Sequence, residues 1–443
     1  MTFSQQDPRT CPWFSRLASP LDRRSAARLA WLFLGAVLAR GRRTVTSWIR
    51  AAGLSAQFQR CYTTVAAAGK KAEAIAAQLL AAAIRPLLGD LSRIMFAIDD
   101  TPTQRYGPFV QGAGVHHNPT PGPANAPHVY GHIWVVMALL LTHPLWGVIA
   151  LPLLARLYVR KKDLPKIDPK HRSTFATKLE MAVELLQWAS KWLGSLGKPL
   201  WVVVDGAYAK APFLKPVMKM GMTVVSRLRK DAALFTVPGP VAPGRRGRRR
   251  IYGDSRIDLA KLAGQNRGWT KRAFNLYGKH AIKRYKTFLA TWRPVAGVIR
   301  VVLVQEPTGW LAFFCTDPNA SVADILGAVA DRFSLETAFR DLKEVVGAGY
   351  QQVRFVWANI GCFHVCMWTY TMTEAWAWSR PSEELVDRSA SPWDTPLRRP
   401  SHADKRRAWR RELLGEEIRQ VLRPGATEDE IQATAERLLN LAA

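Results

Sequence analysis

The chain has 443 residues, of which 48% are hydrophobic and 22% charged, a composition that indicates a globular protein with a sizeable core and excludes a disordered chain. Lys and Arg together number 63 against 34 Asp and Glu, and the net charge of +29 favours a polyanionic partner, nucleic acid before an anionic membrane. The five cysteines are scattered and odd in number, which argues against a disulfide framework and fits a reducing cytoplasm.

Residues 1–90 are predicted to form helices joined by basic turns. The segment 39–65 has the pattern of two short amphipathic helices separated by AAGLS, an arrangement similar to a helix-turn-helix. Three arginines are placed to contact DNA phosphates: Arg42, Arg43 and Arg50. We therefore predict a helical DNA-binding domain over residues 1–90. The alternative is a basic pair of helices that only packs on the next domain.

The first predicted strand, residues 94–98, is apolar and is followed directly by Asp99 and Asp100. Because side chains alternate along a strand, one of these acids faces the site at the strand end and the other turns away, and the spacing does not decide which. Further along, residues 133–155 are apolar apart from a central Thr-His pair and are long enough to span a bilayer. The motif THP inside this stretch predicts a turn, so we expect a hairpin of buried strands rather than a membrane span.

Residues 91–230 are assigned to the first part of an α/β core. Three more elements are expected before residue 230: a helix at 174–194, a strand at 200–204 and a strand at 222–228. The strand at 200–204 ends in Asp205. Residues 231–297 are predicted to form a basic, β-rich insertion, in which the arginine run GRRGRRR at 244–250 is either a DNA-facing surface or a solvated loop.

Residues 298–378 are predicted to complete the core. We expect four elements there: strands at 298–305 and 310–316, and helices over 332–344 and 357–378. In the last helix, Cys362, His364 and Cys366 have a spacing that invites a zinc site, but the sequence has no second half for one, so we expect structural burial. Residues 379–443 are predicted to be a linker and a helical tail.

Two carboxylates, Asp99 and Asp205, directly follow apolar strands. Polar residues at such strand ends lie at the edge of an α/β sheet where ligands bind. Carboxylate oxygens suit Mg²⁺, and two such ions support in-line phosphoryl transfer. The alternative for each aspartate is a turn residue or a helix N-cap.

The stretch RFSLETAFRDLKE, residues 332–344, supplies a third acid. At 3.6 residues per turn, four charged residues fall near one helix face: Arg332, Glu336, Arg340 and Lys343. An acid flanked by bases suits a metal ligand whose neighbours hold phosphates. The alternative is a solvated helix face with ion pairs, each contributing a few tenths of a kcal/mol.

Together these features resemble the DDE transposases of bacterial insertion sequences, and more narrowly the subgroup with a Tyr-x2-Arg-x3-Glu-x6-Lys signature. Arg332, Glu336 and Lys343 reproduce the spacing of that signature, whereas Val329 stands in the tyrosine position. FAIDDT and VVVDGAY match the contexts of the first and second aspartates, and VVSRLRKDA resembles the basic strand that precedes the insertion in these proteins. The resemblance covers about residues 90–375.

The resemblance implies a ribonuclease-H-like mixed sheet flanked by helices, with Mg²⁺ as the cofactor and Mn²⁺ as a substitute. It implies Asp99, Asp205 and Glu336 as the catalytic metal ligands, with the bases of the Glu336 helix on phosphates. The expected partner is double-stranded DNA, both transposon ends and target, handled by a homodimer or larger synaptic complex on the bacterial nucleoid in the cytoplasm, with no membrane.

The expected reaction is recognition of terminal inverted repeats, cleavage of phosphodiesters and joining of the 3′-hydroxyl ends to target DNA. Two other functions stay open at the level of sequence. One is a domesticated or decayed Mg²⁺-dependent nuclease, and the other is a DNA-binding regulator without catalysis.

Overall fold

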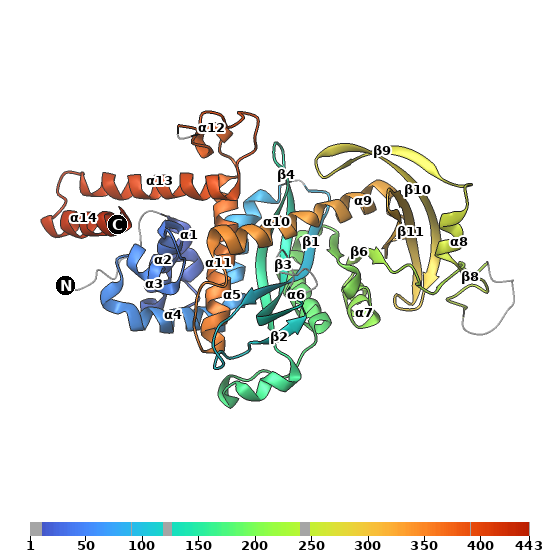
Figure 1. Ribbon diagram of the computed structural model, residues 1–443, viewed down its shortest axis with the longest axis horizontal. Coiled ribbons are helices and arrows are strands. Elements are labelled where there is room, and N and C mark those ends of the chain that lie inside the picture. The colour runs from blue at the N-terminus through green and yellow to red at the C-terminus, as the bar shows by residue number, and fades with distance from the viewer. Residues whose placement is uncertain (1–10, 90, 118–125, 240–248, 390, 443) are drawn as a thin grey trace.

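The computed structural model describes residues 11–89, 91–117, 126–239, 249–389 and 391–442. Three regions follow one another along the longest axis of the molecule (Figure 1): a helical end, a central sheet covered by helices, and a β-rich end. The helical end combines the first helices of the chain with the last two. The arginines at 244–248, which make up most of the predicted run, lie outside the described residues.

The central sheet has the strand order β4-β3-β1-β5-β6. The pairs β3–β4 and β1–β3 are antiparallel, and β5 and β6 run parallel to β1. This mixed α/β arrangement is consistent with the predicted ribonuclease-H-like core. The strands are β1 (Ile94–Gln104), β3 (His128–His143), β4 (Gly147–Tyr158), β5 (Leu200–Val204) and β6 (Thr223–Leu228), with the short β2 (Gly114–His117) on the outer side of β3.

Strand β1 is longer than predicted. The apolar run ends at Ile98, but β1 stays paired with β3 as far as Gln104 opposite Gly131. Gly131 permits this close approach, because a Cβ there would lie 2.2 Å from the backbone oxygen of Thr103. The two aspartates therefore lie inside a strand instead of in a turn.

The apolar stretch 133–155 forms the predicted hairpin, β3 and β4, which turns at residues 144–146. Helix α11 (Val356–Ala377) covers β4, where the Trp368 indole and the Thr371 hydroxyl donate hydrogen bonds to the carbonyl oxygens of Leu153 and Pro152. Helix α6 (Lys178–Leu193) packs on both strands of the hairpin. No helix in the described part of the chain is long and apolar enough to cross a membrane.

The β-rich end continues the same sheet past β6. Strand β12 pairs antiparallel with β6, and β11, β10 and β9 follow it outward. The hairpin β9–β10 arches over the region (Figure 1), and at its turn the ring of Tyr277 meets that of Phe333 at 6.0 Å. The elements are β7 (Leu234–Phe235), β8 (Arg256–Ile257), α8 (Leu259–Gly264), β9 (Thr270–Leu276), β10 (Lys279–Trp292), β11 (Gly297–Glu306) and β12 (Gly309–Cys315).

The N-terminal helices pack directly on the core through α4 and α11. The two backbones touch, because a Cβ on Gly69 would lie 2.1 Å from the oxygen of Trp357, and one on Gly361 would lie 1.9 Å from that of Val65. One face of α4 is thus packed on the core, as expected for a basic pair of helices that packs on the next domain. Arg60 on the other face is exposed. The helices are α1 (Pro12–Ala18), α2 (Arg23–Leu38), α3 (Val45–Ala51), α4 (Phe58–Lys70) and α5 (Ala72–Leu79).

Within α11, the predicted burial of Cys362, His364 and Cys366 is confirmed. All three are fully buried. One ring nitrogen of His364 accepts from the backbone N–H of Ala155, 3.2 Å away, and the other lies 2.8 Å from the carbonyl oxygen of Ile360. The histidine therefore joins α11 to β4.

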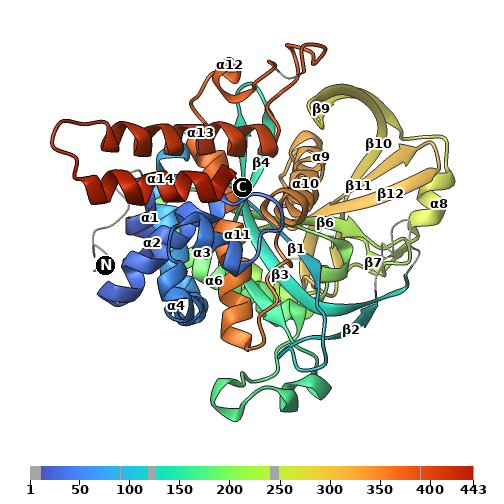
Figure 2. The same cartoon turned by 60° about the vertical axis from the view of Figure 1, so that its left-hand side comes forward.

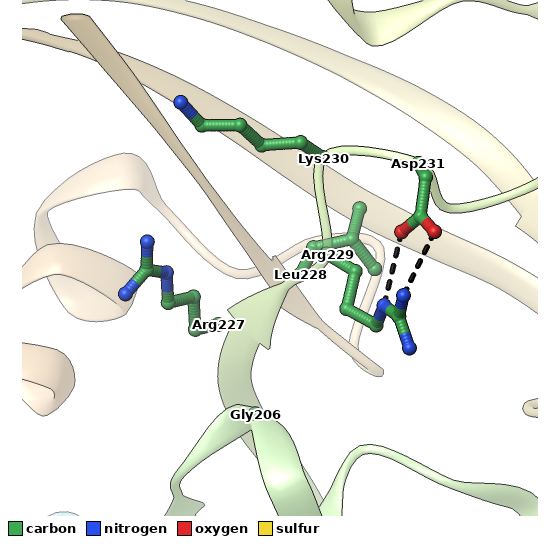
Figure 3. Close-up of a pocket in the computed structure, with 6 residues that line it drawn as sticks. All are labelled: Gly206, Arg227, Leu228, Arg229, Lys230 and Asp231. Atoms are coloured by element: carbon green, nitrogen blue, oxygen red, sulfur yellow. Dashed lines mark hydrogen bonds and ion pairs between the residues drawn. The ribbon is translucent and has the colours of Figure 1, made fainter.

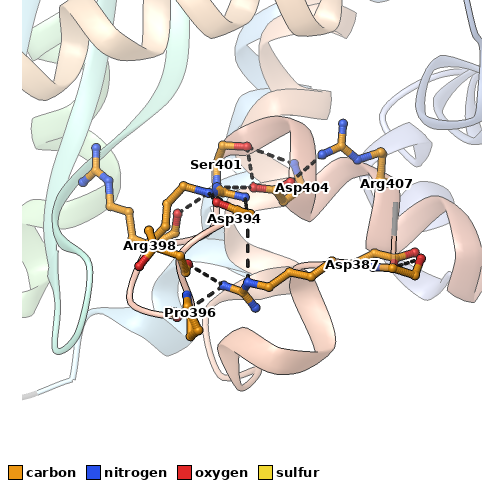
Figure 4. Close-up of polar contacts among 11 residues, drawn as sticks. Asp387, Asp394, Pro396, Arg398, Ser401, Asp404 and Arg407 are labelled. Atoms are coloured by element: carbon orange, nitrogen blue, oxygen red, sulfur yellow. Dashed lines mark hydrogen bonds and ion pairs between the residues drawn. The ribbon is translucent and has the colours of Figure 1, made fainter. Parts of the chain in front are cut away.

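The C-terminal segment holds a polar network between α12 (Ser382–Leu385) and α13 (His402–Val421). Arg398 bonds both Asp394 and Asp404 at 2.7 Å, and Ser401 caps α13 (Figure 4). Helix α14 (Glu428–Ala442) runs back beside α13, and the pair lies against the N-terminal helices (Figure 2). The predicted linker is thus fixed by ion pairs along much of its length.

Candidate active site

The two strand-end aspartates lie side by side. Strands β1 and β5 are parallel and in register from Ile94 beside Leu200 to Ile98 beside Val204, so Asp99 and Asp205 are the next residues on each strand. Asp205 ends its strand and caps the short turn after it, since its side chain accepts a hydrogen bond from the N–H of Ala207 at 3.2 Å. The parallel pairing thus brings both carboxylates to one edge of the sheet.

Asp99 and Asp100 turn to different neighbours. Oδ2 of Asp99 bonds the guanidinium of Arg332 at 2.6 Å. Asp100 pairs instead with Lys178, the first residue of α6, at 2.5 Å, and lies 3.5 Å from the hydroxyl of Tyr208. Asp99 is therefore the acid directed at the helix that carries Glu336.

Arg332 joins Asp99 to Glu336. One guanidinium nitrogen lies 2.6 Å from Asp99, and the other lies 2.8 Å from Oε1 of Glu336. The arginine side chain is 20% exposed and that of Glu336 45%, so the cluster opens to solvent on the glutamate side. Two carboxylates 237 positions apart thus share one cation.

The predicted continuous helix over 332–344 is wrong in detail. Helix α9 (Val322–Asp331) ends before Arg332, and α10 (Phe333–Asp341) begins after it. The chain then widens into a π-turn over Leu342–Val346, which ends at Gly347 with φ +85°. Because the π-turn changes the helical register, Lys343 does not share a regular α-helical face with Glu336.

The electrostatics of the site couple the acids. Burial raises the pKa of Asp99 to about 6, against the opposing effects of Arg332 and the Asp100 N–H, and the charges of Asp100 and Asp205 add to the rise. Burial also raises the pKa of the Tyr208 phenol, and the charges of Asp100, Asp99 and Asp205 raise it further. The tyrosine thus lies within electrostatic reach of all three aspartates.

The donor set is suitable for a divalent metal ion, but its arrangement is not. Oδ1 of Asp99 accepts from the Asp100 N–H at 2.8 Å, and Oδ2 is held by Arg332. Among the residues that the structure describes, no three His, Cys, Asp or Glu side chains come close enough together to hold a metal. The guanidinium of Arg332 lies where an ion would have to bridge Asp99 and Glu336.

A basic hollow of about 530 Å³ lies further along β1. Three predicted DNA-binding residues line it, Arg42 and Arg43 from the loop between α2 and α3 and Lys343 from the π-turn, and none of its lining residues is acidic. Tyr106 and Tyr350 also line the hollow. The hollow thus combines basic and aromatic groups from segments about 300 positions apart, as a nucleic-acid groove does.

Besides Arg332, two further predicted DNA-binding residues lie apart from this hollow. Arg340 has a side chain that is 62% exposed and approaches Asp341 at 3.6 Å. Arg50 is exposed in the last turn of α3. Neither contacts the Asp99–Arg332–Glu336 cluster, and both face solvent.

A second basic hollow, of about 340 Å³, adjoins Gly206, the residue after Asp205. Arg229 is paired there with Asp231 at 2.8 and 3.0 Å, whereas Arg227 and Lys230 point away from that pair (Figure 3). The ammonium of Lys230 lies 4.9 Å from the ring centre of Trp310. The basic stretch VVSRLRKDA signalled this surface, but nothing in the sequence singled out Lys178 beside Asp100.

The fold is α/β, with Asp99 and Asp205 at neighbouring positions on two adjacent parallel strands. The chain belongs to the family described as DDE superfamily endonuclease, whose model matches residues 16–294. This confirms the predicted DDE-type family and makes the protein a nucleic-acid-cleaving enzyme whose family acts on DNA, generally with divalent metal ions. The match includes Asp99 and Asp205 and ends before Glu336. A comparison with curated proteins finds no match.

Proposed function

We propose that the protein is a DNA transposase that binds the inverted repeats at transposon ends, cleaves the phosphodiester there and joins the freed 3′-hydroxyl to target DNA. The observation that carries the proposal is the alignment of Asp99 with Asp205 on parallel strands, with Arg332 linking Asp99 to Glu336. Family membership supports the DNA-cleaving part of this proposal.

The proposed catalytic residues are Asp99, Asp205 and Glu336, and the proposed cofactor is Mg²⁺, with Mn²⁺ as a substitute. When bound, such ions stabilise the attacking and leaving oxygens of an in-line displacement. The parallel pairing of β1 and β5 supports the first two of these residues, because it brings Asp99 and Asp205 to neighbouring positions. The third is carried by a helix that packs on the same core through Leu335 and Ala338.

The proposed DNA path begins at the acids and follows the basic surface on either side. Arg332 and Arg340 contact phosphates near the scissile bond, and Lys343 acts with Arg42 and Arg43 in the hollow beside β1. At about 3.3 Å per residue, Thr103 lies roughly 13 Å along β1 from Asp99. Arg50 extends the same basic surface on the N-terminal helices.

A nuclease that cuts without joining is the second candidate, because the family description names an endonuclease alone. The decisive assay uses the full chain with Mg²⁺ and DNA that carries the repeats flanking its own gene. Transposition predicts both cleaved ends and strand-transfer products when pre-cut ends are supplied. Cleavage without joining would favour the nuclease, and DNA binding that is unaffected by Asp205→Asn, with no cleavage in either protein, would favour a regulator.

We further propose that the protein acts as a homodimer or larger complex that holds two transposon ends together, on the nucleoid in the bacterial cytoplasm. Joining two ends to one target needs two active sites, which supports this assembly. Light scattering of the protein with and without a transposon-end duplex measures it, and a single chain per duplex at all concentrations would contradict it.

A further inference from the structure

Arg332 occupies a position in which two different kinds of partner compete for the same carboxylates. Its guanidinium is bonded to Oδ2 of Asp99 and Oε1 of Glu336, at 2.6 and 2.8 Å. Oδ1 of Asp99 is already engaged by a backbone N–H. A divalent ion that bridges Asp99 and Glu336 therefore has to displace the arginine from at least one of them.

The arginine also has somewhere else to go. Guanidinium groups bind phosphate in the same two-pronged manner as carboxylate. Arg332 lies at the junction of α9 and α10, with a side chain 20% exposed, so it is within reach of a DNA backbone that enters the site. The other cation near the acids, Lys178, is paired with Asp100 and does not bridge Asp99 and Glu336.

We infer that Arg332 is an exchangeable counter-ion that keeps the metal-binding carboxylates closed until DNA arrives. In the free protein it neutralises Asp99 and Glu336 and weakens metal binding. A DNA phosphate draws the guanidinium away and leaves the two carboxylates to the metal. This inference rests on the proposed function, and it adds that DNA and metal bind cooperatively and reciprocally, since each favours the same withdrawn arginine.

Such an exchange keeps the enzyme from binding metal before DNA has docked, and so limits cleavage of DNA that is not its substrate. Two facing carboxylates repel each other and attract free divalent ions. A guanidinium between them neutralises their charge, so both the repulsion and the attraction for metal ions are weakened. Coupling metal loading to docking of the correct phosphate delays cleavage until the substrate is in place.

The experiment measures metal binding without DNA and without catalysis. Free Mn²⁺ is followed by its electron paramagnetic resonance signal during titration of the full chain. We expect Arg332→Ala to bind Mn²⁺ at least about tenfold more tightly than the wild type, because an opposing charge within contact distance is removed. Arg340→Ala removes the same charge two turns further along the helix and should leave Mn²⁺ affinity unchanged.

The same variants are then tested for binding to a duplex in metal-free buffer by fluorescence anisotropy. Arg332→Ala should weaken DNA binding while it strengthens Mn²⁺ binding. If the arginine had only a structural role, its loss would weaken both affinities. Arg332→Lys, a point charge that does not bridge two carboxylates, should fall between the wild type and Arg332→Ala. Circular dichroism confirms that each variant is folded.

The outcomes separate this inference from the proposed function. Mn²⁺ affinity equal to or weaker than that of the wild type in Arg332→Ala, with DNA cleavage intact in the wild type, overturns the inference and leaves the function standing. Tight Mn²⁺ binding that survives in the triple variant Arg332→Ala, Asp205→Asn and Glu336→Gln shows that the ion binds elsewhere, and this overturns both.

Discussion

Two ion clusters in this molecule each join carboxylate and basic side chains, and they differ in what surrounds them. Arg332 joins Asp99 of β1 to Glu336 of α10. In the second cluster, Glu374 of α11 binds His402 and Lys405 of α13, with the His402 ring nitrogen 2.7 Å away. Each cluster links two elements that are distant in sequence.

Their burial and their charge balance differ. The Glu374 and Lys405 side chains are 3% and 4% exposed and carry one charge of each sign. In the Arg332 cluster two carboxylates share one guanidinium, and Glu336 is 45% exposed. If a buried pair of opposite charges exchanges partners, one charge is left buried and unpaired, which is costly. An exposed cluster with excess negative charge can exchange partners without that cost. We conclude that the Glu374 cluster fixes α13 on the core and that the Arg332 cluster can exchange its partners.

The largest expected effect falls on catalysis in the open cluster. Asp99→Asn should lower DNA cleavage by at least about 10³-fold, since several kcal/mol of charge stabilisation in the transition state are lost. Asp100→Asn, at the neighbouring position but paired with Lys178, should lower it far less. Cleavage rates of folded protein on the same duplex compare the two, and equal losses would remove the distinction between these aspartates.

The next effect falls on stability in the buried cluster. Glu374→Gln leaves the ammonium of Lys405 buried without a counter-charge and should lower the free energy of unfolding by about 3–5 kcal/mol. Glu336→Gln, which leaves Arg332 paired with Asp99 at an open position, should cost less than about 1 kcal/mol. Urea unfolding measures both, and a similar cost for the two would contradict the contrast in burial.

The pH dependence should follow the buried glutamate. Burial by itself raises the pKa of Glu374, but Lys405 and His402 together lower it from 4.5 to about 2. Since the folded pKa lies below the unfolded one, the stabilisation is complete above about pH 4.5 and is lost as the pH falls towards 2. The difference in unfolding free energy between the wild type and Glu374→Gln should therefore shrink below about pH 4.5, and a difference that is constant with pH would argue against an ionised Glu374.

The smallest expected effect concerns the basic hollow beside the open cluster. Lys343→Ala should reduce the slope of the logarithm of the DNA-binding constant against the logarithm of salt concentration by about 0.9, for a duplex of roughly 30 base pairs. This is the change expected when one phosphate contact is lost. Lys198 lies before the start of β5, at the opposite edge of the sheet, and its ammonium bonds the carbonyl oxygen of Gly89. Lys198→Ala should leave the slope unchanged, and equal slopes for the two variants would remove the hollow from the DNA path.

Much of the core was predictable from local pattern. The strand β5 (Leu200–Val204) matches its predicted bounds because a short apolar run between turn residues has few other ways to fold. The hairpin of β3 and β4 was predictable for the same reason. Strand β1 was underestimated, since its last residues, Asp99–Gln104, are held in the sheet by pairing with β3 and not by their own propensity.

The site was predictable as a set of residue types and not as a geometry. The sequence predicted Asp205 directly after a strand and Glu336 on a helix, as found, but the parallel register that aligns Asp99 with Asp205 depends on tertiary packing. The break at Arg332 and the π-turn at Lys343 depend on how the chain packs around them. No Gly or Pro lies at the break or within Leu342–Val346, so the local sequence does not predict either feature. The pairing of Asp100 with Lys178 has no local signal at all.

The contact between α4 and α11 through Gly69 and Gly361 fixes the distance between the N-terminal helices and the core. Because the backbones touch, side chains cannot slide between the two helices, and the N-terminal helices are held firmly against the catalytic core. The arginines at 42, 43 and 50 therefore stand at a set spacing from Asp99. A duplex bound to both these arginines and Asp99 would therefore have to span a fixed distance, which the contacts of the two glycines set.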